Sequence, residues 1–160
     1  MKKISEKINR YVEYITAVLL FIMVVIISLQ VFCRHVLDNS LSWSEEVSRY
    51  LFIWITLLAI SVGVKRGFLV SIDFLVDKLK GASKKTIEII CSLLILAFSL
   101  VMMVYGYEIA TKVASQLSPA LRISMTYVYF SIPVSGALIF VHVISIITSQ
   151  IFQFTIKKSS

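Results

Sequence analysis

Four long apolar runs dominate the sequence and fix the environment in which it can fold. An α-helix rises about 1.5 Å per residue, so crossing a hydrocarbon layer about 30 Å thick takes roughly 20 apolar residues. Of the 160 residues, 58% are hydrophobic and 16% are charged. The sequence therefore predicts an all-α integral membrane protein with a single membrane domain over residues 1–160. The expected spans are residues 13–34, 43–64, 86–110 and 125–154.

The basic residues between these spans predict how the chain is oriented. Twelve Lys and Arg residues lie before the first span, between the second and third, and after the fourth, and four lie in the other two loops. Cytoplasmic loops carry the excess of Lys and Arg in membrane proteins. We therefore expect both termini in the cytoplasm. The net charge of +7 then reflects topology, and no nucleic-acid partner is expected.

The middle loop contains a segment with one apolar side. Ile72, Leu75, Val76 and Leu79 recur at helical spacing, and charged residues lie largely opposite. This pattern predicts a short interfacial helix over about residues 70–80. Basic residues around it are candidates for contact with lipid headgroups, with simple marking of topology as the alternative. The candidates are Lys65, Arg66, Lys78, Lys84 and Lys85.

The start of the second span carries an unusual charged cluster. Ser42 and Glu45 have the spacing of a capping box, and Arg49 lies about 10 Å further along the helix, within reach of Glu45 and Glu46. The cluster could only cap the helix and offset the cost of Arg49. Small and β-branched residues continue along the same face, including Ile60, and this favours docking against another protein. The candidate interface residues are Trp43, Glu45, Glu46, Arg49, Ile53, Thr56 and Gly63.

The fourth span carries a polar stripe along one side. Small hydroxyl side chains allow helices to approach closely and to form hydrogen bonds, so packing within the chain explains the stripe. We expect its histidine to be hydrogen-bonded and structural, with proton transfer as the alternative. The helix-packing candidates are Ser131, Ser135, His142 and Ser145.

Two further patterns affect the third and fourth spans. Ser92, Ser99 and Gly106 repeat at seven-residue spacing, which is again typical of helix packing. Pro133, near the start of the fourth span, is expected to bend that helix.

Enzyme and self-contained transporter signatures are missing from the sequence. There is no nucleophile elbow, HExxH motif or P-loop, so no catalytic residues are expected. His35 and His142 lie too far apart to hold one haem iron, and no cofactor or metal is expected. The halves of the chain show no duplication, and paired Gly- or Pro-interrupted spans are absent. The chain is therefore not expected to be the translocation unit itself.

Three stretches of the sequence carry a resemblance to a known family. The first is Leu41 to Leu51, with its W-x-E-E-x-x-R core, and the second runs from Gly63 to Gly67 and on through Ile72 to Val76. The third begins at Ser118 and ends at Pro133. In these positions, and in length and order of spans, the chain resembles the DctQ/SiaQ-like small membrane subunit of tripartite ATP-independent periplasmic (TRAP) transporters.

This resemblance implies a non-catalytic subunit of a complex in the bacterial inner membrane. Such a complex imports an organic acid of the C4-dicarboxylate or sialic acid class by sodium symport. The small subunit would act as a scaffold for a large membrane transport subunit, with a periplasmic substrate-binding protein and membrane lipids as the other partners. The alternative is a self-contained small transporter that works as a homo-oligomer.

Overall fold

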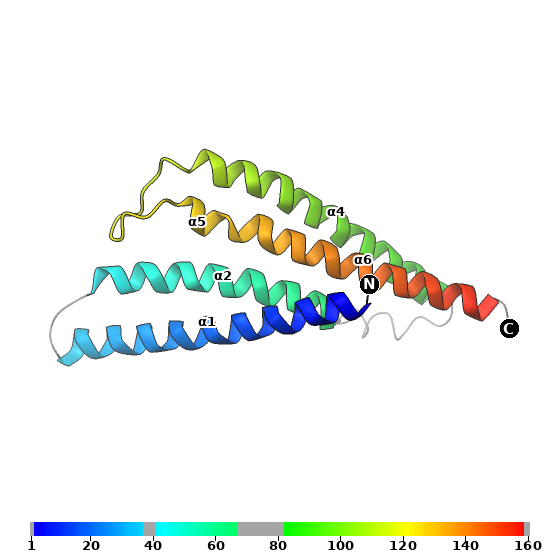
Figure 1. The fold of residues 1–160 in the computed structure, drawn as a ribbon, viewed down its shortest axis with the longest axis horizontal. Helices are drawn as coiled ribbons and strands as arrows, with labels where there is room; N and C mark the ends of the chain where they lie inside the picture. The colour runs from blue at the N-terminus through cyan, green and yellow to red at the C-terminus, as the bar shows by residue number, and fades with distance from the viewer. Residues whose placement is uncertain (1, 37–40, 67–81, 159–160) are drawn as a thin grey trace.

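The computed structural model describes residues 2–36, 41–66 and 82–158. Four segments of its helices are long and apolar enough to cross a membrane, which confirms the all-α, four-span prediction. The predicted interfacial helix at 70–80 lies outside the described residues. The helices are α1 (Lys2–Val36), α2 (Ser42–Arg66), α4 (Ala82–Lys112), α5 (Thr126–Tyr129) and α6 (Ser131–Lys158) (Figure 1).

The four long helices lie side by side in one layer. Their order across the layer is α1, α2, α6, α4: α1 packs on α2, α2 on α6, and α6 on α4 (Figure 1). A helix in the middle of such a row is covered on two sides, whereas an edge helix is covered on one. Accordingly, the share of buried residues in the apolar part of each span is largest, at 39%, for the span in α5 and α6 and smallest, at 0%, for the span in α1.

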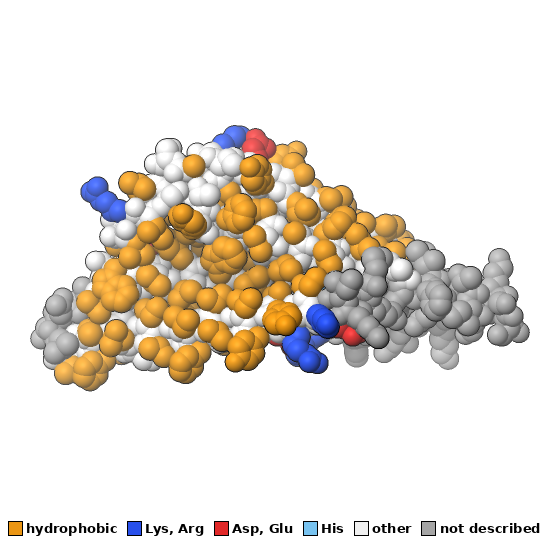
Figure 2. Space-filling model, viewed as in Figure 1, with side chains coloured by type: hydrophobic (Ala, Val, Ile, Leu, Met, Phe, Trp, Pro, Cys, Tyr) orange, Lys and Arg blue, Asp and Glu red, His pale blue; other side chains and the backbone are white. Residues whose placement is uncertain are grey.

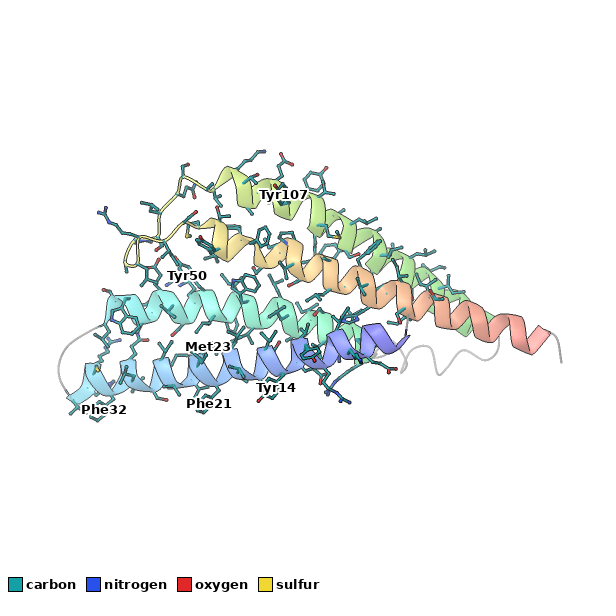
Figure 3. All side chains as sticks on the ribbon, in the orientation of Figure 1. Tyr14, Phe21, Met23, Phe32, Tyr50 and Tyr107 are labelled. Carbon is teal, nitrogen blue, oxygen red and sulfur yellow. The ribbon has the colours of Figure 1, made fainter. Side chains whose placement is uncertain are left out.

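The faces of the layer are apolar. Figure 2 shows one face covered by hydrophobic side chains, with Lys, Arg and Glu side chains near its rim. Helix α1 directs Tyr14, Phe21 and Phe32 away from the layer, and Met23 lies on the side of α2 (Figure 3). In a membrane-spanning chain such side chains meet lipid tails or the apolar surface of another protein.

Small residues let α4 and α6 approach closely. A Cβ atom added at Gly136 would lie 3.1 Å from both the Met103 nitrogen and the Ser99 carbonyl oxygen, which are backbone atoms of α4. One added at Gly106 would lie 2.8 Å from Ile132 Cγ2 of α6. Ser99, whose carbonyl oxygen is one of these atoms, is fully buried. The two helices are therefore in contact along a strip that has no room for larger side chains.

The fourth span is interrupted near its beginning. Proline has no N–H group, so Pro133 cannot donate a hydrogen bond to the carbonyl four residues earlier, at Tyr129. The helix is divided there into α5 and α6, with Phe130 between them. Backbone bonds from Phe130 to Thr126 (2.8 Å) and from Val134 to Phe130 (3.3 Å) keep the two pieces joined. The expected bend at Pro133 thus takes the form of a short break.

Candidate partner interface

The first turn of α2 differs from the predicted capping box. The helix begins at Ser42, and the contacts that close its first turn run to the Leu41 carbonyl, from the Ser44 nitrogen (3.1 Å) and the Ser44 hydroxyl (2.7 Å). Glu45 turns along the helix instead and accepts a hydrogen bond from Arg49 Nη2 at 3.2 Å. Glu45, which was expected to cap the helix, is therefore paired with Arg49.

The Arg49–Glu45 ion pair lies on the outside of the layer. The Arg49 side chain is 68% exposed and that of Glu45 is 65% exposed. Exposed pairs of this kind contribute little to the stability of a fold in water. On a helix that spans a membrane, however, charged groups need polar surroundings. The exposed pair therefore indicates that α2 has polar surroundings at this point, and it adds little to the stability of the fold.

Glu46 points the other way, into the layer. Only 9% of this residue is exposed, and its carboxylate accepts three hydrogen bonds. The donors are the Tyr50 hydroxyl, the Ala120 nitrogen (2.8 Å) and the Leu121 nitrogen (2.9 Å). Helical spacing placed both Glu45 and Glu46 within reach of Arg49, and the described ion pair is with Glu45. Backbone donors 74 and 75 residues further along the chain hold the Glu46 carboxylate, and helical spacing cannot reveal partners at that separation.

The loop that supplies these donors connects α4 to α5 and has a defined structure. Leu117 and Ser124 form an antiparallel bridge, and the Ser118 nitrogen donates to the Ile123 carbonyl at 2.9 Å. Arg122 has a φ of 53°, a conformation that non-glycine residues adopt mainly in tight turns. We call residues 113–125 the outer loop. Sequence reasoning missed it as the partner of Glu46.

Two aromatic side chains add to the connection between α2 and this region. The Trp54 indole nitrogen donates to the Tyr127 carbonyl of α5 at 3.1 Å. The Tyr50 hydroxyl, besides bonding Glu46, lies 3.5 Å from the Met125 sulfur. Figure 3 shows Tyr50 between α2 and the outer loop. Together with Glu46, these side chains tie the first three turns of α2 to the second half of the chain.

The remaining candidate interface residues fall into two groups. Trp43 and Thr56 are exposed, and the Thr56 hydroxyl donates to the Phe52 carbonyl of its own helix at 2.7 Å. Ile53 and Gly63 are half-buried. Most of the candidates therefore lie on the exposed side of α2, and among the described residues Glu46 is the candidate whose side chain bonds a distant part of the chain. Their contact with a partner stays a prediction.

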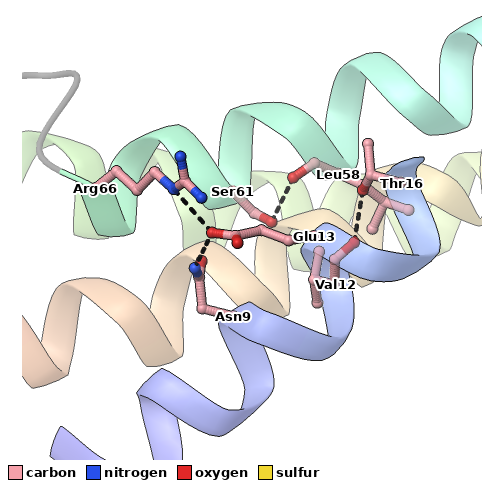
Figure 4. A network of polar contacts seen from close by, with 7 residues as sticks. All are labelled: Asn9, Val12, Glu13, Thr16, Leu58, Ser61 and Arg66. Carbon is pink, nitrogen blue, oxygen red and sulfur yellow. Dashed lines mark hydrogen bonds and ion pairs between the residues drawn. The ribbon is translucent and has the colours of Figure 1, made fainter. Parts of the chain in front are cut away.

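An ion pair joins the N-terminal part of α1 to the C-terminal end of α2. Arg66 donates from Nε to Glu13 Oε1 at 2.8 Å, and Asn9 donates to the same oxygen at 2.5 Å (Figure 4). Of the other candidates for lipid contact, Lys65 is half-buried, Lys84 and Lys85 lie in the first turn of α4, and Lys78 lies outside the described residues. Arg66 is thus the candidate with a described partner in the chain.

The polar stripe of α6 faces its neighbours in the layer. Ser131, Ser135 and His142 are fully buried, and Ser145 is 4% exposed. His142 Nδ1 and the Ser5 hydroxyl share a hydrogen bond of 2.9 Å, which fastens the first turns of α1 to α6. Ser131 donates to the Val128 carbonyl at 2.6 Å. Among the described residues, no group of three His, Cys, Asp or Glu side chains is placed to hold a metal ion.

The Glu13–Arg66 pair is expected to stabilise the inner end of the layer. Replacing Glu13 by Gln, or Arg66 by Gln, should lower the apparent Tm in detergent by roughly 2–3 °C, because each change leaves the other charge unpaired. The double replacement should be no worse than either single one. A thermal scan followed by circular dichroism measures this.

The matched control for this pair is Glu108–Lys112, an exposed pair within one turn of α4. Replacing Glu108 by Gln and Lys112 by Leu should leave the apparent Tm nearly unchanged, since this pair joins no two helices. Equal effects at both pairs would contradict a bracing role for Glu13 and Arg66.

Comparison with known proteins places this architecture in a family. Residues 23–153 match the family described as tripartite ATP-independent periplasmic transporters, DctQ component. The sialic acid TRAP transporter small permease protein SiaQ of Vibrio cholerae is 29% identical, over 85% of this chain and 79% of that protein. A putative TRAP transporter small permease protein of Haemophilus influenzae is 26% identical, over 95% of this chain and 94% of its own length.

A longer relative matches as well. The sialic acid TRAP transporter permease protein SiaT of Haemophilus influenzae is 26% identical over 95% of this chain, which corresponds to 24% of SiaT. With four apolar helices and permease relatives, the chain is a multi-pass protein of the inner membrane. The matched residues include α2, the outer loop and α6 up to residue 153, and so they include the contacts of Glu46, Tyr50 and Trp54. The chain therefore belongs to the DctQ-component family of tripartite ATP-independent periplasmic transporters.

Proposed function

We propose that this chain is the non-catalytic scaffold for the large transport subunit of a TRAP transporter. The complex would import an organic acid of the sialic acid or C4-dicarboxylate class with sodium, and a periplasmic substrate-binding protein would deliver the acid. The names of the relatives support the class of transporter, and the match to a quarter of SiaT supports a close association with a larger permease. A single layer of helices does not surround a pathway for a substrate, so it suits a scaffold better than the transporting part of a complex.

The observation that carries this proposal is the exposed Arg49–Glu45 pair on a membrane-spanning helix. Lipid tails cannot solvate such a pair, whereas polar groups on another protein can. The exposed side of α2 continues past this pair to Thr56 and Ile60. A helix of the large subunit laid along this side would cover the pair and bury apolar surface next to it.

We further propose that both termini lie in the cytoplasm. The positive-inside rule supports this orientation, since Lys7 and Arg10 of α1 and Lys65 and Arg66 of α2 lie at the same end of the layer. The outer loop and the start of α2 would then face the periplasm. The Arg49–Glu45 pair would lie near the periplasmic edge of the membrane.

Co-purification of the two subunits tests the scaffold proposal. We expect Arg49→Leu and Thr56→Trp each to reduce recovery of the large subunit with this chain by about tenfold, the loss expected for a residue central to an interface. Lys112→Leu is the matched control, because it removes an exposed basic residue at the same end of the layer but on α4. Full recovery with both α2 variants would show that this side of α2 is not the interface.

The alternative of a self-contained transporter has its own test. Proteoliposomes that contain this chain alone should show no sodium-dependent uptake of sialic acid or of a C4-dicarboxylate. Uptake by the chain alone would establish the homo-oligomeric alternative. The relatives, which are permease subunits, favour the scaffold.

A further inference from the structure

A hollow opens where α2 separates from α5 and α6. Its volume is about 580 Å³, and the outer loop closes one end of it. Residues of α2 that are three and four apart form one wall, and α5 with the start of α6 forms the other. In Figure 1 the two walls diverge toward the outer loop. The contacts of Glu46, Tyr50 and Trp54 hold the walls together across this separation.

The hollow combines apolar walls with two opposite charges. Ile53 on α2 and Val128 and Ile132 on the other side provide apolar surface. Glu45 and Arg49 also line the hollow, and their exposed ion pair brings one negative and one positive group within 3.2 Å of each other. The Glu46 carboxylate, which lines the hollow as well, already accepts three hydrogen bonds. A ligand of the hollow therefore needs an apolar part for the walls, and a polar part with a positive group for Glu45 and a negative group for Arg49.

We propose that the hollow binds one molecule of phosphatidylethanolamine. Part of an acyl chain would lie against Ile53, Val128 and Ile132. The phosphate would bind the Arg49 guanidinium, and the ammonium group would bind the Glu45 carboxylate, so that the lipid headgroup replaces the ion pair. The hollow falls within the range of small-ligand sites, about 300–1,000 Å³, which suits a segment of one lipid.

Charge complementarity favours this zwitterionic lipid over an anionic one. The hollow is lined by two carboxylates, Glu45 and Glu46, and by one guanidinium, Arg49. Phosphatidylglycerol would bring a phosphate without an ammonium group, so the Glu45 carboxylate, displaced from Arg49, would have no partner. Arg49 lies about 10 Å along α2 from Ser42, which places it near the level of the lipid headgroups if α2 begins at the membrane surface.

This inference goes beyond the proposed function, because it identifies what fills the hollow and not which protein covers α2. Glu45, Arg49 and Ile53 line the hollow and are also candidate interface residues. A lipid in the hollow would therefore be part of any contact made by this side of α2. Lipid binding can be measured on this chain alone, so it is tested separately from assembly with the large subunit.

Native mass spectrometry of the full chain in mild detergent tests this proposal. Dioleoyl phosphatidylethanolamine and dioleoyl phosphatidylglycerol are added separately at equal concentration. We expect at least about tenfold more of the chain to retain the first lipid, the preference that one charge-assisted hydrogen bond gives. Glu45→Gln should remove this preference, because only the ammonium group distinguishes the two lipids, and Arg49→Leu should reduce retention of both lipids, whereas Arg49→Lys should keep most of it. Ile53→Trp, which fills the hollow, should reduce retention of both lipids.

The control replaces an ion pair of the same kind that lines no part of this hollow. Glu108→Gln together with Lys112→Leu should leave lipid retention unchanged. Circular dichroism of each variant shows whether its helices are intact. Equal retention of the two lipids, or native retention in both Arg49→Leu and Ile53→Trp, would overturn the proposal. Retention of neither lipid by the native chain would overturn it too, and would favour a side chain of the large subunit as the occupant.

Discussion

Replacing Glu46 by alanine is expected to lower the apparent Tm of the chain in detergent by roughly 5–10 °C. The carboxylate accepts hydrogen bonds from Tyr50, Ala120 and Leu121, and alanine leaves all three donors without it. Hydrogen bonds to a charged group are stronger than neutral ones, and a buried donor without a partner is costly. The outer loop should also lose its attachment to α2. A thermal scan measures the first effect, and hydrogen exchange at the Ala120 and Leu121 amides measures the second.

Two variants make this test specific. Glu45→Ala changes the neighbouring, exposed carboxylate and should have little effect on the Tm, because the described partner of Glu45, Arg49, lies on the same helix. Glu46→Gln keeps an oxygen for the two loop amides but loses the charge, so its effect should be intermediate. If Glu46→Ala and Glu45→Ala melted at the same temperature and exchanged alike in the loop, Glu46 would not hold the loop.

Replacing Gly136 by valine is expected to destabilise the packing of α4 on α6 by about 1–3 kcal/mol, the usual cost of adding atoms to a packed site. The first added carbon already meets Met102 Cβ at 3.0 Å and two backbone atoms of α4 at 3.1 Å. Backbone atoms cannot rotate aside as a side chain can, so the helices must separate. The expected result is a lower yield of folded protein and a lower apparent Tm.

The matched control for Gly136 adds the same kind of bulk on an open surface. Ala97 lies on α4, the helix that Gly136 approaches, but its side chain is exposed. Ala97→Val should therefore leave the Tm nearly unchanged. Gly136→Ala should fall between the two, because its single added methyl group meets the same three atoms. A Gly136→Val chain as stable as Ala97→Val would contradict the close approach of α4 and α6.

The helices of this fold could be predicted because each one depends on a local property of the sequence. A run of roughly 20 apolar residues can only be satisfied by a helix across the membrane, whatever the rest of the chain does. The break at Phe130 follows equally locally from the missing N–H group of Pro133. The polar first turns of α1, from Lys2 onward, were outside the expected span because hydropathy detects only the apolar part of a helix.

The arrangement of the helices and the partners of the charged residues could not be predicted in this way. Helical spacing showed that both Glu45 and Glu46 were in reach of Arg49, and the structure pairs Arg49 with Glu45 alone. The partner of Glu46 is the outer loop, whose backbone amides leave no trace in the residue pattern. The pairing of Glu13 with Arg66, and of Ser5 with His142, likewise depends on which helices are neighbours.

The order of the helices across the layer divides the chain into two hairpins. Helices α1 and α2 form the first, and α4 with α5 and α6 forms the second; the two meet where α2 packs on α6. That junction is fastened by Glu46, Tyr50 and Trp54 at its outer end and by the apolar contact of Val64 with α6 at its inner end. We therefore expect each hairpin to insert as a unit during synthesis, and the native layer to be complete only when the second hairpin docks on the first.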